Sequence, residues 1–149
     1  MSRVNGTSVL PYSRLMPAAR WDVLLVVAVG GALGSLGRWA LSQAVTTAPG
    51  GFPWATLLAN VSGGFAIGVL MVFVLDVWTP SRLVRPFLGV GVLGGFTTVS
   101  TYLLDTRALI VADRAPLAAS YVFGTLAAGL TAVWAGILLA RLATLGTRS

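Results

Sequence analysis

Long apolar runs separated by short polar breaks set the pattern of this chain. Four runs, at about residues 22–41, 53–78, 84–104 and 115–140, each reach the roughly 20 residues that an α-helix needs to cross a bilayer core. The breaks between them, TTAPGGFP, WTPSR and DTRALIVADRAP, hold the Pro, Gly and charged residues that end helices. The pattern predicts an all-α membrane protein with four transmembrane helices.

The ends of the chain differ from this middle part. Residues 1–20 are polar and irregular, with Gly6, Pro11 and Pro17, and are predicted to form a flexible N-terminal tail. No small-residue cleavage site follows the first apolar run, so we expect no signal peptide. The predicted organisation is a tail over residues 1–20, a four-helix transmembrane domain over 21–141 and a C-terminal tail over 142–149.

Composition narrows the possible functions. Only 9% of the 149 residues are charged, whereas soluble domains carry about a quarter. The charges are ten Arg and four Asp, and the chain has no His, Cys, Lys or Glu. The missing residue types remove most hydrolytic and transition-metal chemistry and argue against an enzyme. The arginines form no basic patch, so nucleic-acid binding is not indicated either.

The arginines predict an orientation in the membrane. Two of them, Arg107 and Arg114, lie on one side of a four-span protein, with Arg38 near that face. Because positive residues favour the cytoplasmic side, both termini are predicted to be cytoplasmic. The side that carries the termini holds seven arginines: Arg3, Arg14, Arg20, Arg82, Arg85, Arg141 and Arg148.

Two glycines and four hydroxyl residues interrupt the third run, in LGGFTTVSTY. Gly94 and Gly95 are poor helix formers, so a break is predicted near Gly94–Thr97. A break frees backbone carbonyls, which discontinuous membrane helices use to bind cations such as Na⁺. The pair would alternatively serve only close packing between helices.

The hydroxyls that follow form two sets. Thr98 and Thr101 are three residues apart and share a helix face. Thr97 and Ser100 form a second pair beside them. They would line a hydrophilic track, or each would bond back to its own helix.

Three further polar positions lie within or near the spans. Asn60 would join two helices by a hydrogen bond, or would donate to a permeating anion. Tyr121 and Thr125 share a face of the fourth span and would either pack or extend the track. Arg38 would extend to the interface or attract anions in a narrow vestibule.

Small residues recur at four-residue spacing, as in Gly30/Gly34, Gly64/Gly68 and Gly91/Gly95. Lipid gives helices no hydrophobic drive to associate, so these pairs predict close packing within the subunit or between subunits. Asp22, Asp76 and Asp105 are all predicted to lie at span ends. Because a proton-coupled exporter needs a buried acid, this placement favours a passive path.

Three segments together, GGALGSLGRW, TLLANVSGG and GVLGGFTTVSTY, resemble the CrcB/Fluc family of small fluoride channels. The resemblance covers roughly residues 22–140. It implies an antiparallel dimer of four-helix subunits with two fluoride pores. It also implies a structural Na⁺ at the dimer interface, held by the carbonyls of Gly94 and Thr97.

The resemblance assigns roles position by position. Asn60 matches the pore-lining asparagine, and Arg38 matches the arginine near the vestibule. Ser100 and Thr101, next to Thr98, match the hydroxyl track, and Tyr121 and Thr125 match polar positions of the fourth span. The chain departs from the family's Thr-Thr-Phe-Ser-Thr-Phe, because Val99 and Tyr102 replace the two phenylalanines. Tyr102 keeps an aromatic edge toward the pore, and Val99 does not.

The function predicted from the sequence is a fluoride-selective channel subunit of the cell inner membrane that exports cytoplasmic fluoride. One alternative is a non-conducting subunit that completes a partner's pore, which Val99 keeps open. Another is a small antiparallel four-helix multidrug exporter, which the lack of a mid-span carboxylate disfavours. Either a homodimer or a heterodimer is compatible with the sequence. The arginine bias and Val99 together favour a heterodimer with an oppositely oriented paralogue.

Overall fold

The structure is a computed structural model that describes residues 21–74 and 82–145, with no side-chain description at Leu145. The predicted tail at 1–20, the end of the second predicted span around Trp78, and residues 146–149 lie outside the described residues. The described chain is helical, and four of its segments are long and apolar enough to cross a membrane. Its elements are α1 (Trp21–Ala44), α2 (Trp54–Val72), η3 (Pro86–Leu93), α3 (Gly94–Phe96), α4 (Val99–Val111) and α5 (Ala115–Leu145).

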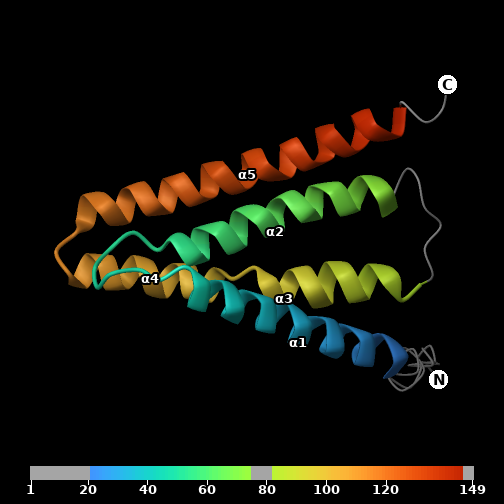
Figure 1. Cartoon of the computed structure of the whole chain (residues 1–149), viewed down its shortest axis with the longest axis horizontal. Coiled ribbons are helices and arrows are strands. Elements are labelled where there is room, and N and C mark those ends of the chain that lie inside the picture. The colour runs from blue at the N-terminus through green and yellow to red at the C-terminus, as the bar shows by residue number, and fades with distance from the viewer. Residues whose placement is uncertain (1–20, 75–81, 146–149) are drawn as a thin grey trace, which may run out of the picture.

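The helices form two pairs that lie side by side. Helix α2 packs along α5, and α1 packs along η3 and α3. The first residue of α1 and the last turn of α5 lie at the same end of the molecule, as four crossings require (Figure 1). The segment between α1 and α2 and the turn between α4 and α5 lie together at the opposite end.

Glycines allow both pairs to approach closely. A methyl group added to Gly30 would lie 2.6 Å from the Phe87 carbonyl oxygen, and one added to Gly95 would lie 2.5 Å from that of Gly31. On the other pair, added methyl groups at Gly68 and Gly136 would collide with backbone carbonyls across the interface. The predicted close packing of the glycine pairs within the subunit is therefore confirmed.

The third crossing is built from three pieces. It begins as a π-helix, η3, continues through the short α3, and then loses helical geometry at two residues. Thr97 has φ −79° and ψ 156°, and Thr98 has φ −151° and ψ 127°, so both are extended. The predicted break is present, with its extended residues at Thr97 and Thr98. Gly94 and Gly95 are themselves helical.

One predicted boundary was wrong. The third span was expected to end at Leu104, which put Asp105 at the membrane surface, but α4 continues to Val111. Asp105 therefore lies within the helix. Its carboxylate accepts hydrogen bonds from neighbouring helices, and sequence pattern alone does not show such partners.

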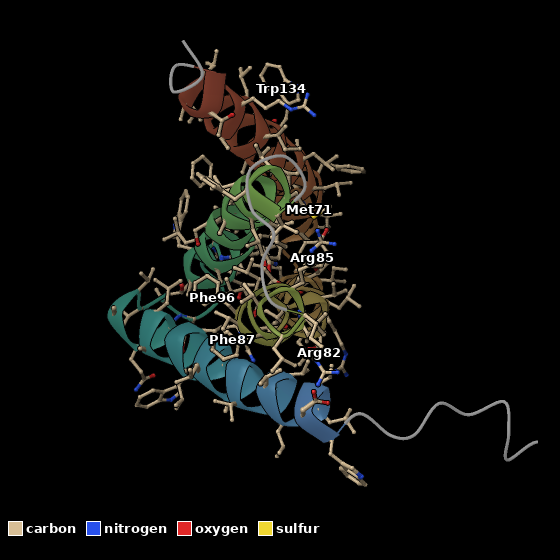
Figure 2. The ribbon with its side chains drawn as sticks, turned by 90° about the vertical axis from the view of Figure 1, so that its right-hand side faces the viewer. Met71, Arg82, Arg85, Phe87, Phe96 and Trp134 are labelled. Atoms are coloured by element: carbon tan, nitrogen blue, oxygen red, sulfur yellow. The ribbon has the colours of Figure 1, made fainter. Side chains whose placement is uncertain are left out.

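Large apolar side chains cover the outside of the bundle, as expected for a surface that faces lipid. Trp134 is 65% exposed and projects from the outer side of α5 (Figure 2). An ion pair between Arg82 and Asp22 ties the start of the third crossing to the first turn of α1. Arg85 donates to the Val74 carbonyl oxygen at 2.8 Å and so satisfies an acceptor at the end of the second crossing.

Candidate ion path

The break in the third crossing is held open by Asn60. The Thr98 N–H donates to Asn60 Oδ1 at 2.8 Å, and Asn60 Nδ2 donates to the Thr98 carbonyl oxygen at 3.0 Å. The amide of α2 thus satisfies both backbone groups of an extended residue inside the membrane, where unpaired groups are costly. The predicted bond between helices is made. One N–H of the same amide is not used by this pairing, and Asn60 lines an open groove.

Two backbone carbonyls lose the donors that an unbroken helix would give them. The Thr98 N–H, four residues after Gly94, donates to Asn60 instead of the Gly94 carbonyl. The Thr101 N–H donates at 3.1 Å to Thr98 Oγ1, the N-cap of α4, instead of to the Thr97 carbonyl. Hard carbonyl oxygens are the ligand type that small cations prefer. The pair predicted to hold Na⁺ therefore fits that role by its chemistry.

The hydroxyl residues after the break form one connected cluster around Thr98. Its Oγ1 lies 3.2 Å from Ser100 Oγ and donates to Thr101 Oγ1 at 3.1 Å. Thr97 differs, because its Oγ1 donates to the Leu93 carbonyl oxygen of its own helix at 2.9 Å. The structure thus brings Thr98, Ser100 and Thr101 together, as predicted, and turns the hydroxyl of Thr97 back to its own helix.

A groove of about 440 Å³ runs beside this cluster, between α2, α4 and α5. Its walls are mostly apolar. Asn60, Thr97, Thr98 and Thr125 supply the small uncharged polar groups along it. Val99, which is 72% exposed, lines the groove at its open side.

Thr125 has a buried hydroxyl without a partner. The residue is 6% exposed, and its Oγ1 has no hydrogen bond to any of the residues that the structure describes. Most membrane threonines bond back to their own helix, as Thr131 Oγ1 does on α5 by donating to the Ala127 carbonyl oxygen at 2.8 Å. Thr125 lines the groove, although its hydroxyl oxygen is itself covered. A hydroxyl that forgoes the bond to its own helix can bond a ligand in the groove once the side chain rotates toward it.

Tyr102 lines the groove, and its hydroxyl bonds to α5 and not to the hydroxyl cluster. The hydroxyl donates to the Val122 carbonyl oxygen of α5 at 3.0 Å. Its ring lies 5.3 Å from that of Tyr121, which is fully buried and 5.4 Å from Phe52 in an edge-on arrangement. The aromatic ring expected at position 102 therefore lies in the wall of the groove.

Tyr121 does not reach the groove. Its hydroxyl donates to Asp105 Oδ2 at 3.3 Å, and Thr56 Oγ1 donates to the same oxygen at 2.6 Å. Thr56 is also buried. The sequence indicated neither this three-residue cluster nor its position, because the three residues come from three different helices. The one sequence feature that could have indicated this cluster is Thr56, a polar residue one turn before Asn60 on the same face of α2.

Two further cavities lie on the other side of the hydroxyl cluster. We call the first, of about 300 Å³ and lined by Arg38, Trp39, Thr98 and Thr101 among others, the inner cavity. The second, of about 390 Å³, lies under the α1–α2 segment with Asp105 in its wall, and we call it the outer cavity. Both are lined by Thr56 and Thr101, so they adjoin. Thr98 lines both the groove and the inner cavity and so lies between them.

Arg38 points into the protein. It is half-buried, lines the inner cavity, and its Nε donates to the Gly95 carbonyl oxygen at 3.3 Å. Ser35 Oγ contacts the same oxygen at 3.5 Å. Arg38 therefore lies beside the inner cavity and bonds the backbone of the third crossing. Its attraction of anions stays a prediction.

Comparison with known proteins adds independent information. The CrcB-like protein family (Camphor Resistance, CrcB) matches residues 25–137. A relative from Nocardia farcinica (strain IFM 10152) is named fluoride-specific ion channel FluC 2. It is 50% identical over 122 residues, which are 82% of this chain and 87% of the relative.

Two relatives come from one strain of Streptomyces avermitilis. The protein named fluoride-specific ion channel FluC 3 is 47% identical over 124 residues, which are 83% of this chain and 61% of that protein. The protein named fluoride-specific ion channel FluC 2 is 50% identical over 104 residues, which are 70% of this chain and 66% of that protein. The residues matched in the Nocardia protein and in FluC 3 cover most of this chain.

Proposed function

This chain belongs to the CrcB-like protein family, and from that premise we propose that it is a subunit of a fluoride-selective channel. The observation that carries the proposal is the buried Thr125 hydroxyl, which lacks a partner among the described residues and belongs to a residue that lines the same groove as Asn60. The family consists of ion channels, so the chain is not an enzyme.

The donors along the groove suit a small, strongly hydrated anion. A pore for such an ion must replace its water with hydrogen-bond donors that do not trap it. The second N–H of Asn60 and the hydroxyls of Thr98 and Thr125 are uncharged donors. The ring edge of Tyr102 is weakly positive and can also face an anion. We propose that fluoride passes along the groove and leaves through the Thr98, Ser100 and Thr101 cluster toward Arg38.

Fluoride would leave the cell without energy coupling. Fluoride enters acidified cells as neutral HF and is trapped as the anion at the higher internal pH. A membrane potential that is negative inside drives the anion outward, by about 2.3 kcal/mol per charge per 100 mV. In this proposal the channel lies in the inner membrane of the cell, with both termini in the cytoplasm, and protects against fluoride toxicity.

Ion efflux from liposomes tests the function. Vesicles loaded with potassium fluoride or potassium chloride would carry the reconstituted channel, and valinomycin would release the counter-ion. We expect rapid fluoride efflux and chloride efflux that is at least about a hundredfold slower. Equal rates for the two ions would contradict fluoride selectivity, and no fluoride efflux from any assembly that contains this chain would contradict the proposal itself.

We also propose that two subunits pair antiparallel around a structural Na⁺. The carbonyl oxygens of Gly94 and Thr97 would hold the ion, because both have lost their helical donors. The ion would fix the two breaks at the dimer interface. Each of the two subunits would supply two carbonyl oxygens. Crystals grown in sodium that show density for an ion between these four oxygens would support the site. An assembly that is equally stable when all Na⁺ is replaced by a large organic cation would contradict it.

The partner in this proposal is an oppositely oriented paralogue. Seven arginines against two or three favour one orientation for this chain. Val99 leaves the edge of the groove without an aromatic ring, and two identical subunits would lack that ring in both pores. The two Streptomyces avermitilis relatives show that one organism can carry two such chains.

Flux measured with and without a partner decides between the two assemblies. We expect weak fluoride efflux from this chain alone and strong efflux when it is reconstituted with an oppositely oriented paralogue. Robust efflux from this chain alone would remove the need for a partner. The alternative, for which Val99 is the evidence, is a non-conducting chain that only completes the partner's pore. This alternative predicts that blocking the partner's own pore abolishes all fluoride flux.

A further inference from the structure

Arg114 lies at the rim of the outer cavity, on the turn that joins α4 to α5. Gly50 lines that cavity and has a φ of +70°, which favours glycine. A methyl group added to Gly50 would lie 3.4 Å from Arg114 Nε and 3.7 Å from its Cζ. The guanidinium group therefore lies against bare backbone of the α1–α2 segment, beside the cavity.

The local structure does not explain why an arginine occupies this position. The Arg114 carbonyl oxygen accepts the Ala118 N–H at 2.9 Å, so Arg114 precedes the first turn of α5 as its N-cap. This position favours Ser, Thr, Asn or Asp, and a cation there opposes the helix dipole. The first turn of α5 has no acidic residue that would compensate. Within residues 21–74 and 82–145, Arg114 takes part in no salt bridge.

The other charges at this end of the molecule indicate what the arginine does. Asp105 lines the outer cavity, and its negative charge would repel an anion that leaves through this cavity. Asp113 precedes Arg114 in the turn, and Arg107 is exposed on α4. Neither arginine lines either cavity itself, but Arg114 lies against Gly50, which lines the outer one. Arg114 is the basic residue that lies against the cavity rim and can oppose the charge of Asp105.

We propose that Arg114 lowers the energy of fluoride in the mouth of the outer cavity, where the ion leaves the protein, and so raises its local concentration there. This role rests on the proposed fluoride channel and adds a residue to it. One unit charge about 6 Å from an anion in water changes the local anion concentration about threefold. Reversing the sign of the charge would therefore change it about tenfold. Salt weakens the effect, because the screening length falls from about 30 Å at 10 mM to about 3 Å at 1 M.

The chain has no cysteine, so single cysteines can be introduced and labelled without background. Arg114→Cys would be reconstituted in the assembly that gives fluoride efflux, together with any partner that it requires. A methanethiosulfonate reagent would attach either a trimethylammonium or a sulfonate group. Arg107→Cys is the matched control, because it places the same charges on α4 at an exposed residue that neither lines either cavity nor contacts Gly50. Efflux of potassium fluoride would be measured at about 10 mM and about 1 M sodium isethionate.

We expect the sulfonate at position 114 to give efflux about tenfold slower than the trimethylammonium at low salt. This difference should fall below about twofold at high salt, and it should be much smaller at position 107. A purely structural role would not depend on the sign of the added charge. Equal rates for both labels at 114, or the same difference at 107, would overturn the inference while the proposed function stands. No fluoride efflux from the unmodified assembly would overturn both.

Discussion

Asn60 engages the backbone of a single residue with both polar ends of its amide. Its oxygen accepts the Thr98 N–H and its nitrogen donates to the Thr98 carbonyl. It therefore holds the break in place and still has a second N–H at the groove. Both the shape of the third crossing and the proposed ion path therefore depend on the side chain of Asn60.

Asn60→Asp tests this dependence. An aspartate would put an acceptor opposite the Thr98 carbonyl oxygen and a negative charge beside the groove. A lost hydrogen bond and an unsatisfied partner cost about 1–3 kcal/mol each, so we expect fluoride efflux to fall by at least about a hundredfold. Gln43→Glu is the control, because it makes the same chemical change at an exposed position near the end of α1. Efflux at the wild-type rate from correctly assembled Asn60→Asp would show that the ion does not pass this residue.

Much of the candidate site could be predicted from residue types, and the rest depends on contacts between helices. Asn60, Thr98, Ser100 and Thr101 stand out because polar side chains are rare and costly in apolar runs. The place of Asp105 could not be predicted in this way. Its charge interrupts the apolar run, so the pattern ends the span before it. Hydrogen bonds from Thr56 on α2 and Tyr121 on α5 stabilise it within the bundle, and these contacts are not visible in the sequence.

At the scale of elements, α2 and α5 approach each other through glycines. The four spans and the break could be predicted from the length of the apolar runs and from the glycine and hydroxyl cluster. The pairing of α2 with α5 and of α1 with η3 could not, since several helices carry small residues at suitable spacing. Which helices pair depends on where a glycine of one helix lies opposite a backbone carbonyl of another, as Gly136 of α5 lies opposite the Phe65 carbonyl oxygen of α2.

Gly136→Ala should separate α2 from α5. The added methyl group would collide with the Phe65 carbonyl oxygen, which is backbone and cannot move aside cheaply. Overpacking of this kind costs about 1–3 kcal/mol, so we expect the thermal transition in detergent to fall by about 5 °C or more. Gly124→Ala on the same helix is the control, because no atom of the structure lies within 4 Å of its added methyl group. Equal thermal transitions for the two variants would contradict the packing of α2 on α5.

At the scale of the whole molecule, the described ends of α1 and α5 lie on one side of the bundle (Figure 1). An even number of crossings requires this, and the arginine bias predicts that this side is cytoplasmic. A chain with a fixed orientation cannot form an antiparallel pair with an identical copy. Orientation is therefore the property of the whole chain that decides what kind of partner it takes.

Cysteine labelling measures the orientation. Ser2→Cys and Ser149→Cys would be treated with a membrane-impermeant maleimide, before and after the cells are permeabilised. Because the native chain has no cysteine, all labelling reports the new residue. We expect labelling only after permeabilisation for both variants. Comparable labelling from both sides would contradict a fixed orientation and favour a homodimer.

Thr125→Val tests whether fluoride passes along the groove and contacts the Thr125 hydroxyl. Valine keeps the shape of threonine and removes a hydroxyl that has no partner in the described structure, so stability should change by less than about 1 kcal/mol. Fluoride efflux should fall about tenfold or more, because a hydrogen bond to an ion contributes about 1.5–3 kcal/mol. Thr131→Val, which removes a hydroxyl bonded to its own helix, should leave efflux within about twofold of wild type. Unchanged efflux in Thr125→Val, or an equal loss in Thr131→Val, would show that fluoride does not depend on the Thr125 hydroxyl for its passage.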